Sequence, residues 1–288
     1  MTIDSDAQVR LAAGALSCAT ALFVATGAVV STESGIVDLR DVDAFGVAFP
    51  AFRALGLSQT ELYAPRLFKK AKKDALVAWG FHAARRDMYR FTPPHSALAT
   101  LVRWAETMRD GAFALTTNVD GHLQRAYFRA DRVLEFHGSV EWLQCVRGCG
   151  APPFPGGLVD VAIDVKTSRA VLPLPKCPAC DGLARPNVLL LEDAKWDSSR
   201  AVEQEEHLNA WLADVRTQRG RKLVVLECGV DATSTATRTK CERIAAAMEA
   251  TLVRIHPSDA RTPREHVGVE LGVGAAIESI DRELRKLR

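Results

Sequence analysis

Five short apolar runs recur along the chain, and turn-forming residues bound each of them. The runs are continuous rather than alternating, which predicts β-strands covered on both faces, as in a parallel sheet. Helical stretches lie between them, and this alternation is typical of an open α/β sheet of Rossmann type. Such a sheet binds its ligands at the carboxyl ends of the strands. The five runs are residues 21–26, 112–117, 132–137, 222–227 and 251–256.

Helix signals fill the connections between these runs. Residues 93–110 begin with two prolines, which a first helical turn accepts, and residues 200–220 end in basic residues followed by glycine. Residues 236–250 lie between the fourth and fifth runs, and residues 272–287 have apolar positions at helical spacing. We expect this last helix to pack on the sheet, although it could equally support a dimer.

The most basic part of the chain, residues 65–90, mixes Lys and Arg with large apolar residues such as Trp79 and Phe81. This mixture predicts the solvated face of a packed helix rather than a stripe that binds phosphates. The net charge of the whole chain is only +2, whereas nucleic-acid-binding proteins usually have a much more basic footprint. We therefore expect no nucleic-acid partner.

Residues 11–30 contain no charged residue, and about 20 apolar residues are enough to cross a bilayer. This stretch, however, is rich in Ala, Gly, Ser and Thr, and Asp4 and Asp6 precede it in place of a basic cluster. It also lacks the small-residue cleavage pattern of a signal peptide. It predicts a buried helix followed by a buried strand, and we expect a cytoplasmic protein without a membrane partner.

Residues 138–188 break the alternation of strands and helices. They hold four of the seven cysteines, and seven prolines lie from Pro152 to Pro186 inclusive. A chain of 288 residues fits one large domain with a small insert better than several equal domains. We therefore predict a Rossmann-like domain made of residues 1–137 and 189–288, with residues 138–188 inserted as a small module.

The four cysteines of this insert form two close pairs, with 27 residues between the pairs. That spacing is typical of a structural zinc ribbon, in which two knuckles close one tetrahedral thiolate site. Disulfide bonds and metal-free thiols are the alternatives, and disulfides are rare in cytosolic α/β proteins. A site with four protein thiolates is closed, and hence structural rather than catalytic. The predicted ligands of Zn²⁺ are Cys145, Cys149, Cys177 and Cys180.

Polar residues follow the second and third apolar runs directly. Asn118 and Asp120 come just after the second run, and His137 ends the third. Because the carboxyl ends of parallel strands border the ligand crevice of an open sheet, an amide, a carboxylate and an imidazole could converge there, beside the loop 26–35. A histidine at such a strand end is a candidate for acid–base chemistry, because its ordinary pKa lies near neutrality.

Seven features, taken in order over roughly residues 20–285, resemble the sirtuin family, in a divergent form of bacterial type. They are GAVVSTESGIVDLR, TTNVDG, EFHGS, the two cysteine pairs, ARPNVLLLED, LECGV and LVRIHP. The resemblance implies a Rossmann-type enzyme with an inserted zinc module. It also implies NAD as co-substrate, and removal of an acyl group from lysine with release of nicotinamide as the activity.

The resemblance further implies roles for individual residues. His137 would be the catalytic base that deprotonates a ribose hydroxyl after nicotinamide leaves, and Asn118 and Asp120 would bind the ribose and the displaced carboxamide. The four cysteines would be the zinc ligands. The cofactor-binding residues implied in this way are Gly27, Ala28, Ser31, Asp38, Arg40, Thr117, Gly229 and His256.

The chain departs from the family's pattern around the cofactor and the acyl group. Val29 stands at the second glycine of the usual Gly-Ala-Gly, where glycine permits a positive φ and a close approach to phosphate. Leu39 replaces the aromatic residue of Asp-Phe-Arg, and Glu192 replaces the glycine of the Phe-Gly-(Glu/Asp) element that lines the acyl-lysine tunnel. At the adenosine end, Asp231 replaces the serine of Gly-Thr-Ser, and His256 replaces an asparagine.

We therefore expect an NAD-dependent deacylase that acts on an acylated protein or a small acylated amine, with plain acetyl-lysine not its best substrate. An NAD-consuming ADP-ribosyltransferase or an NAD hydrolase is the first alternative, because both need only the NAD half of the site. A catalytically impaired protein of the same fold, which binds a nucleotide or scaffolds a complex, is the second. Val29, Leu39 and His256 favour this second alternative, whereas the three polar residues at the strand ends oppose it.

Overall fold

The computed structural model describes residues 5–69, 72–157 and 159–287. At its centre lies a six-stranded sheet in the order β3-β2-β1-β7-β8-β9, in which every neighbouring pair is parallel. Numbered within this sheet alone, the order is 3-2-1-4-5-6, that of the Rossmann fold. The strands are β1 (Ala21–Thr26), β2 (Ala112–Thr116), β3 (Val133–Glu135), β7 (Leu223–Cys228), β8 (Thr251–Ile255) and β9 (Val267–Val269).

The five strands predicted from the apolar runs are confirmed. Strand β3 is shorter than its run and ends at Glu135. The sixth strand, β9, was not predicted. It spans three residues at the edge of the sheet, and so short a segment does not form a recognisable apolar run.

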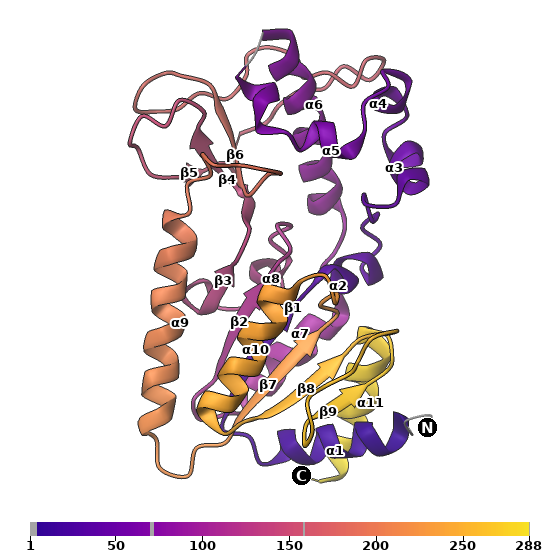
Figure 1. Ribbon diagram of the computed structural model, residues 1–288, viewed down its shortest axis with the longest axis vertical. Helices are drawn as coiled ribbons and strands as arrows, with labels where there is room; N and C mark the ends of the chain where they lie inside the picture. Colours follow the sequence, from indigo (N-terminus) through magenta and orange to yellow (C-terminus); the bar gives the residue numbers. More distant parts are fainter. Residues whose placement is uncertain (1–4, 70–71, 158, 288) are drawn as a thin grey trace.

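Helices cover both faces of the sheet, as predicted (Figure 1). Side chains of each strand alternate between the faces. Leu22 and Val24 of β1 belong to one core cluster, and Phe23 and Ala25 belong to the other. The first cluster contains residues of α1 (Ser5–Ser17), α7 (Ser96–Glu106) and α11 (Val273–Lys286), and the second contains residues of α9 (Ser199–Thr217) and α10 (Thr235–Met248). The predicted helices are therefore present.

A further group of elements forms a second part of the molecule, above the sheet in Figure 1. It contains a small antiparallel sheet in the order β5-β4-β6 and a group of helices. These elements are β4 (Gly138–Cys145), β5 (Phe154–Pro155), β6 (Ala184–Val188), α3 (Val42–Ala48), α4 (Pro50–Ala54), α5 (Gln59–Leu62), η1 (Pro65–Phe68) and α6 (Lys72–Phe91).

Helix α6 connects the two halves of this second part. Ala78 and Trp79 pack with residues of β4 and β6, and the indole N–H of Trp79 donates to the carbonyl of Ala184 at 2.9 Å. Val77 and Phe81 pack with α3, α4 and α5. The boundaries of the inserted module at residues 138 and 188 stay a prediction, and the packing of α6 favours counting residues 42–91 with the smaller part.

The interpretation of residues 65–90 as a solvated face is wrong for the middle of α6. His82, Arg85 and Arg86 are almost completely buried, between the two apolar clusters that flank the helix. Arg86 donates to backbone carbonyls of Gly156 and Val159, which satisfies part of its hydrogen-bonding capacity inside the protein.

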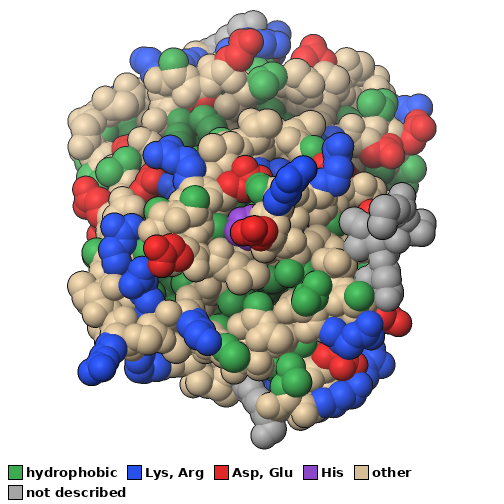
Figure 2. Space-filling model, turned by 60° about the horizontal axis from the view of Figure 1, so that its bottom comes forward, with side chains coloured by type: hydrophobic (Ala, Val, Ile, Leu, Met, Phe, Trp, Pro, Cys, Tyr) green, Lys and Arg blue, Asp and Glu red, His purple; other side chains and the backbone are tan. Residues whose placement is uncertain are grey.

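Across residues 5–69, 72–157 and 159–287, no helix combines the length and the apolar character needed to cross a membrane. The stretch 11–30 instead supplies the end of α1, strand β1 and the start of α2 (Ala28–Glu33). On the face drawn in Figure 2, Lys and Arg side chains are interspersed with Asp and Glu. That mixed distribution agrees with the small net charge.

Candidate functional site

The register of the parallel sheet brings the carboxyl ends of its strands to one level. Thr26 of β1 pairs with Thr116 of β2 on one side and with Cys228 of β7 on the other. Strand order reverses between β1 and β7, and open α/β sheets bind ligands in the crevice at such a reversal. The loops after β1, β2 and β7 therefore meet where a ligand is expected.

A pocket of about 350 Å³ opens at this edge of the sheet, within the usual range of about 300–1,000 Å³ for small-molecule sites. Most of the predicted site residues form its wall, from segments far apart in the sequence. They are Ala28, Ser31, Asp38, Arg40, Thr117, Asn118, Asp120 and His137. Gly27, Gly229 and His256 are not among the residues that line it.

Asn118 and Asp120 are held by hydrogen bonds to neighbouring segments. The side-chain amide of Asn118 donates to the carbonyl of Gly27 at 2.9 Å. The carboxylate of Asp120 accepts from the hydroxyl of Ser31 at 2.6 Å and from the backbone N–H of His122 at 2.9 Å. His122 begins α8 (His122–Arg125). These bonds join the end of β2 to α2, so the two loops form one rigid wall.

His137 is half-buried and lines the pocket. Its Nδ1 lies 3.2 Å from the carbonyl oxygen of Thr117. Because a carbonyl only accepts, Nδ1 carries the proton and Nε2 is left as the basic nitrogen. Burial lowers the pKa of His137, since desolvation disfavours the imidazolium, and the Thr117 carbonyl opposes this effect. The imidazole is therefore neutral near pH 7 and can accept a proton, as a general base must.

The structure corrects the expectation for Val29. The chain enters α2 directly after Gly27, so Val29 has an ordinary helical backbone and its position requires no positive φ. Its side chain packs against the apolar core beside Gly229, where an added Cβ would lie 2.6 Å from that of Val29. Val29 is not among the residues that line the pocket, and it does not fill the ligand space.

Gly27 and Gly229 pack backbone to backbone where β1 and β7 end. The N–H of Gly27 donates to the carbonyl of Cys228 at 3.0 Å. A Cβ on Gly27 would lie 2.4 Å from the carbonyl oxygen of Gly229 and 2.5 Å from the Cα of Val230. Gly229 itself has a φ of +62°, which favours glycine. These two glycines are needed for close approach of the loops.

Arg40 joins two carboxylates at the mouth of the pocket. Its guanidinium contacts Asp38 through Nε at 2.9 Å and Nη2 at 2.7 Å, and contacts Asp231 through Nη1 at 2.7 Å. The hydrogen bonds from Arg40 hold the pKa of Asp38 below its ordinary value. Nε2 of His256 lies 3.5 Å from the second carboxylate oxygen of Asp231.

Sequence reasoning missed one wall of the pocket, which α5, the residue that follows it and α6 supply; the residues are Gln59, Tyr63, Arg85 and Tyr89. The guanidinium of Arg85 lies over the rings of Tyr63, at 4.7 Å, and Tyr89, at 5.1 Å, and its Nε donates to the Tyr89 hydroxyl. Its Nη1 is buried and has no hydrogen-bond partner among the described residues. The four-residue spacing of Arg85 and Tyr89 on a helix was the only signal available in the sequence.

The segment after β6 differs from the expectation for an acyl-lysine tunnel. Leu191 and Glu192 are exposed, and Glu192 has a φ of +53°. Asp193 is buried and forms a salt bridge with Arg185 of β6 at 2.5 Å. None of the three residues at 191–193 lines the pocket, whereas Leu189 does. Asp193 therefore holds the segment in place instead of facing a ligand.

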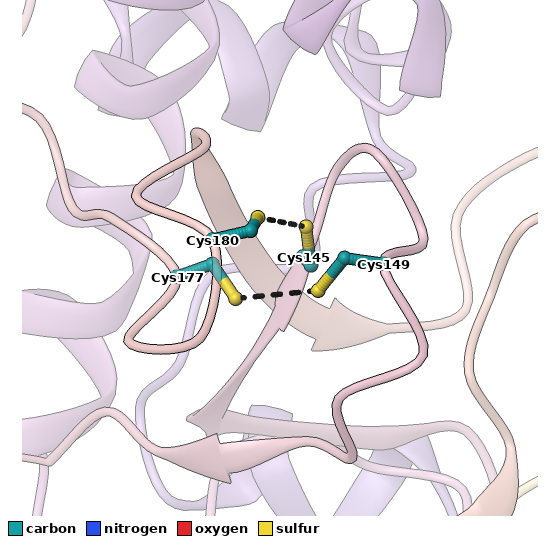
Figure 3. A group of neighbouring side chains, drawn as sticks. All are labelled: Cys145, Cys149, Cys177 and Cys180. Carbon is teal, nitrogen blue, oxygen red and sulfur yellow. Dashed lines mark hydrogen bonds between the residues drawn. The ribbon is translucent and has the colours of Figure 1, made fainter.

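The four predicted zinc ligands come together as Figure 3 shows. The Sγ atoms of Cys145 and Cys180 lie 3.6 Å apart, and those of Cys149 and Cys177 lie 3.7 Å apart. These separations exclude disulfide bonds, which measure about 2.05 Å. Four thiolates at about 2.3 Å from one Zn²⁺ would be about 3.8 Å apart. All four sulfur atoms lie within 4.8 Å of one another, so the cluster fits a closed tetrahedral zinc site.

Two features define the architectural class of this chain. The first is a sheet in the Rossmann strand order with a ligand pocket where the order reverses, and the second is a four-cysteine module that follows β3. The model of the Sir2 family matches residues 27–213, and the chain belongs to that family.

Relatives extend this similarity over nearly the whole chain. The NAD-dependent protein deacylase 1 of Pseudomonas aeruginosa is 30% identical over 285 residues, covering 97% of this chain and 98% of the relative. An NAD-dependent protein deacetylase of Caldivirga maquilingensis is 30% identical over 220 residues, covering 75% of this chain and 74% of the relative. The solved structure of a Sir2 homologue in complex with NAD covers 96% of this chain and 94% of its own, with a TM-score of 0.61 and 22% identity. This last likeness supports the fold.

Proposed function

We propose that the protein is an NAD-dependent deacylase, which removes an acyl group from lysine or a related amine and releases nicotinamide. The observation that carries this proposal is the convergence of His137, Asn118 and Asp120 on one pocket at the carboxyl edge of the sheet. A non-catalytic scaffold would not require a neutral imidazole with a free Nε2 there. Family relatives named NAD-dependent protein deacylases support the same conclusion.

The residues of the pocket fit the parts of this reaction. Asn118 and Asp120 would orient the ribose and carboxamide of NAD, and Arg40 would face the negatively charged part of the dinucleotide. NAD, when bound, supplies the ribose carbon that takes the acyl oxygen as nicotinamide leaves. Nε2 of His137 would accept the proton of a ribose hydroxyl. The four-cysteine cluster would hold Zn²⁺ for structure alone, because all four coordination positions are protein thiolates.

Calorimetric titration with NAD, followed by assay of nicotinamide release, tests the proposal. We expect saturable NAD binding, and nicotinamide release that depends on an acyl-lysine peptide, because the acyl oxygen is the nucleophile. Release without any acyl substrate would instead support an NAD hydrolase or an ADP-ribosyltransferase. Lack of NAD binding at millimolar concentration would leave the non-catalytic alternative.

We further propose that the preferred acyl group ends in a carboxylate. Arg85 places a buried cation in the pocket wall, and its Nη1 is without a hydrogen-bond partner among the described residues. A guanidinium binds a carboxylate through paired hydrogen bonds, and an unsatisfied buried donor is costly. An acyl carboxylate would therefore complete the hydrogen bonding of Arg85, whereas a plain acetyl group would not.

Substitution Arg85→Met should lower kcat/KM for a lysine peptide with a carboxylate-terminated acyl group by about 10- to 100-fold, the usual effect of losing a charged hydrogen bond. The matched substrate is the same peptide carrying an acetyl group, for which activity should stay level or rise. Steady-state assays of both peptides provide the measurement. An equal loss on both substrates would show that Arg85 only supports the fold.

A further inference from the structure

The segment after β7 contributes Asp231 and Ser234 to the pocket wall and is held against the first turn of α2. The carbonyl of Gly229 accepts from the backbone N–H of Val29 at 3.2 Å. Two residues further on, the carboxylate of Asp231 accepts from Nη1 of Arg40 at 2.7 Å. Arg40 and Asp231 are separated by 191 residues in the sequence. This ion pair therefore joins two segments that both line the pocket.

His256 lies close to the other oxygen of the Asp231 carboxylate. The Nδ1 of His256 accepts backbone N–H groups of Ser258 and Asp259, at 3.3 and 3.0 Å. Since Nδ1 accepts, Nε2 carries the proton, and it lies 3.5 Å from Asp231 Oδ1. One oxygen of the carboxylate thus faces Arg40, and the other faces His256. Of these two contacts, the one with Arg40 is a hydrogen bond.

The charges in the pocket wall are mixed. Its described lining residues include two arginines, Arg40 and Arg85, and three aspartates, Asp38, Asp120 and Asp231. Arg40, the cation at the mouth, already contacts two carboxylates. The side chains of Arg40 and Asp231 are 53% and 23% exposed, and an ion pair this exposed adds little to folding stability. The Arg40–Asp231 ion pair in the pocket wall is therefore not explained by its contribution to folding stability.

We propose that Asp231 is an internal competitor of the cofactor for Arg40. The inference rests on the proposed function, in which the pocket binds a dinucleotide with two negatively charged phosphates. Those phosphates must displace the carboxylate from Arg40 before the guanidinium can bind them, and they are repelled by the carboxylate until it turns away. Asp231 therefore weakens the affinity for NAD.

The substitution Asp231→Asn removes the charge and keeps the shape of the side chain. By calorimetry at low salt, we expect it to bind NAD about two- to fivefold more tightly than the wild type, the scale of one partly exposed ion pair. This gain should shrink as ionic strength rises, because salt screens the charges. A purely structural role would lower the melting temperature without producing either effect.

Two further variants test whether the gain in affinity comes from competition for Arg40 or from a general loss of negative charge. Asp131→Asn breaks an equally short but distant pair, Asp131 with Arg129 at 2.7 Å, and should leave NAD affinity unchanged. Compared with Arg40→Ala alone, the double variant Arg40→Ala/Asp231→Asn should show a smaller gain, because the competition for Arg40 is gone and only the repulsion by Asp231 is removed.

Binding of NAD to the wild type, with equal or weaker binding to Asp231→Asn, would overturn this inference while leaving the proposed function intact. It would indicate that Asp231 contacts the dinucleotide directly, for example by accepting from a ribose hydroxyl. Failure of both proteins to bind NAD would overturn the proposed function and the inference together. Binding to Asp231→Asn alone would support the competition by Asp231 and would contradict the proposed function of the wild type.

Discussion

His137→Ala should lower kcat/KM for deacylation by about 10²- to 10⁴-fold, the usual contribution of a general base. The geometry requires this loss because the Thr117 carbonyl fixes the proton on Nδ1, and the described pocket wall contains no other imidazole. NAD binding should persist, since His137 lies beside the pocket residues that would hold the dinucleotide and is not itself charged. Nicotinamide release and calorimetry measure the two properties separately.

The pH profile and a matched variant complete this test. Burial lowers the pKa of His137, and the imidazole acts as a base only when neutral, so wild-type activity should persist below the ordinary histidine pKa of about 6.5. The acid limb assigned to His137 should be absent from the residual rate of the variant. His207→Ala, which alters an exposed histidine on α9, should retain full activity. Full activity of His137→Ala would refute its role as the base.

Removing Zn²⁺ should produce the largest effect on stability. The four cysteines join the end of β4 and the loop after it to the loop that precedes β6. Cys177 is 1% exposed. Because structural zinc contributes several kcal/mol to folding, Cys177→Ser or a strong chelator should lower the melting temperature by about 10 °C or more. Metal analysis should find one equivalent of zinc in the wild type and none in Cys177→Ser.

Cys18→Ser serves as the control, because Cys18 is an exposed cysteine outside the cluster; its metal content and melting temperature should match those of the wild type. A wild-type protein that lacks zinc, or a Cys177→Ser variant that melts like the wild type, would contradict a structural zinc site.

The sequence predicted the parts of the fold that local patterns determine. Strands β1 and β7 are buried on both faces and therefore read as continuous apolar runs. The polar residues Asn118 and His137 could be assigned to one crevice because each follows a strand of the same parallel sheet. The cysteine spacing likewise predicted the zinc site. Each pair is close in the sequence, so the two pairs need only to meet once to supply all four ligands.

Other features depend on contacts that no local pattern contains. Arg85 is buried because Tyr63 and Tyr89 stack on its guanidinium, and in the sequence it belongs to a run of charges that resembles a solvated helix. Val29 was interpreted as an obstacle because the position was expected to need a glycine. Only the start of α2 at Ala28 shows that the residue is helical. The pairing of Arg40 with Asp231 spans nearly two thirds of the chain and could not be inferred from either segment.

Helix α6 has a consequence for how selectivity in this protein can vary. Trp79 anchors it to the zinc-bearing sheet, and Arg85 lies six residues further on, about 9 Å along the helix axis. Arg85, which would bind the acyl group, thus belongs to the smaller part of the molecule. Asn118, which would bind the cofactor, directly follows a strand of the large sheet. Substitutions in the smaller part can therefore change acyl-group selectivity without altering the residues that would bind the cofactor.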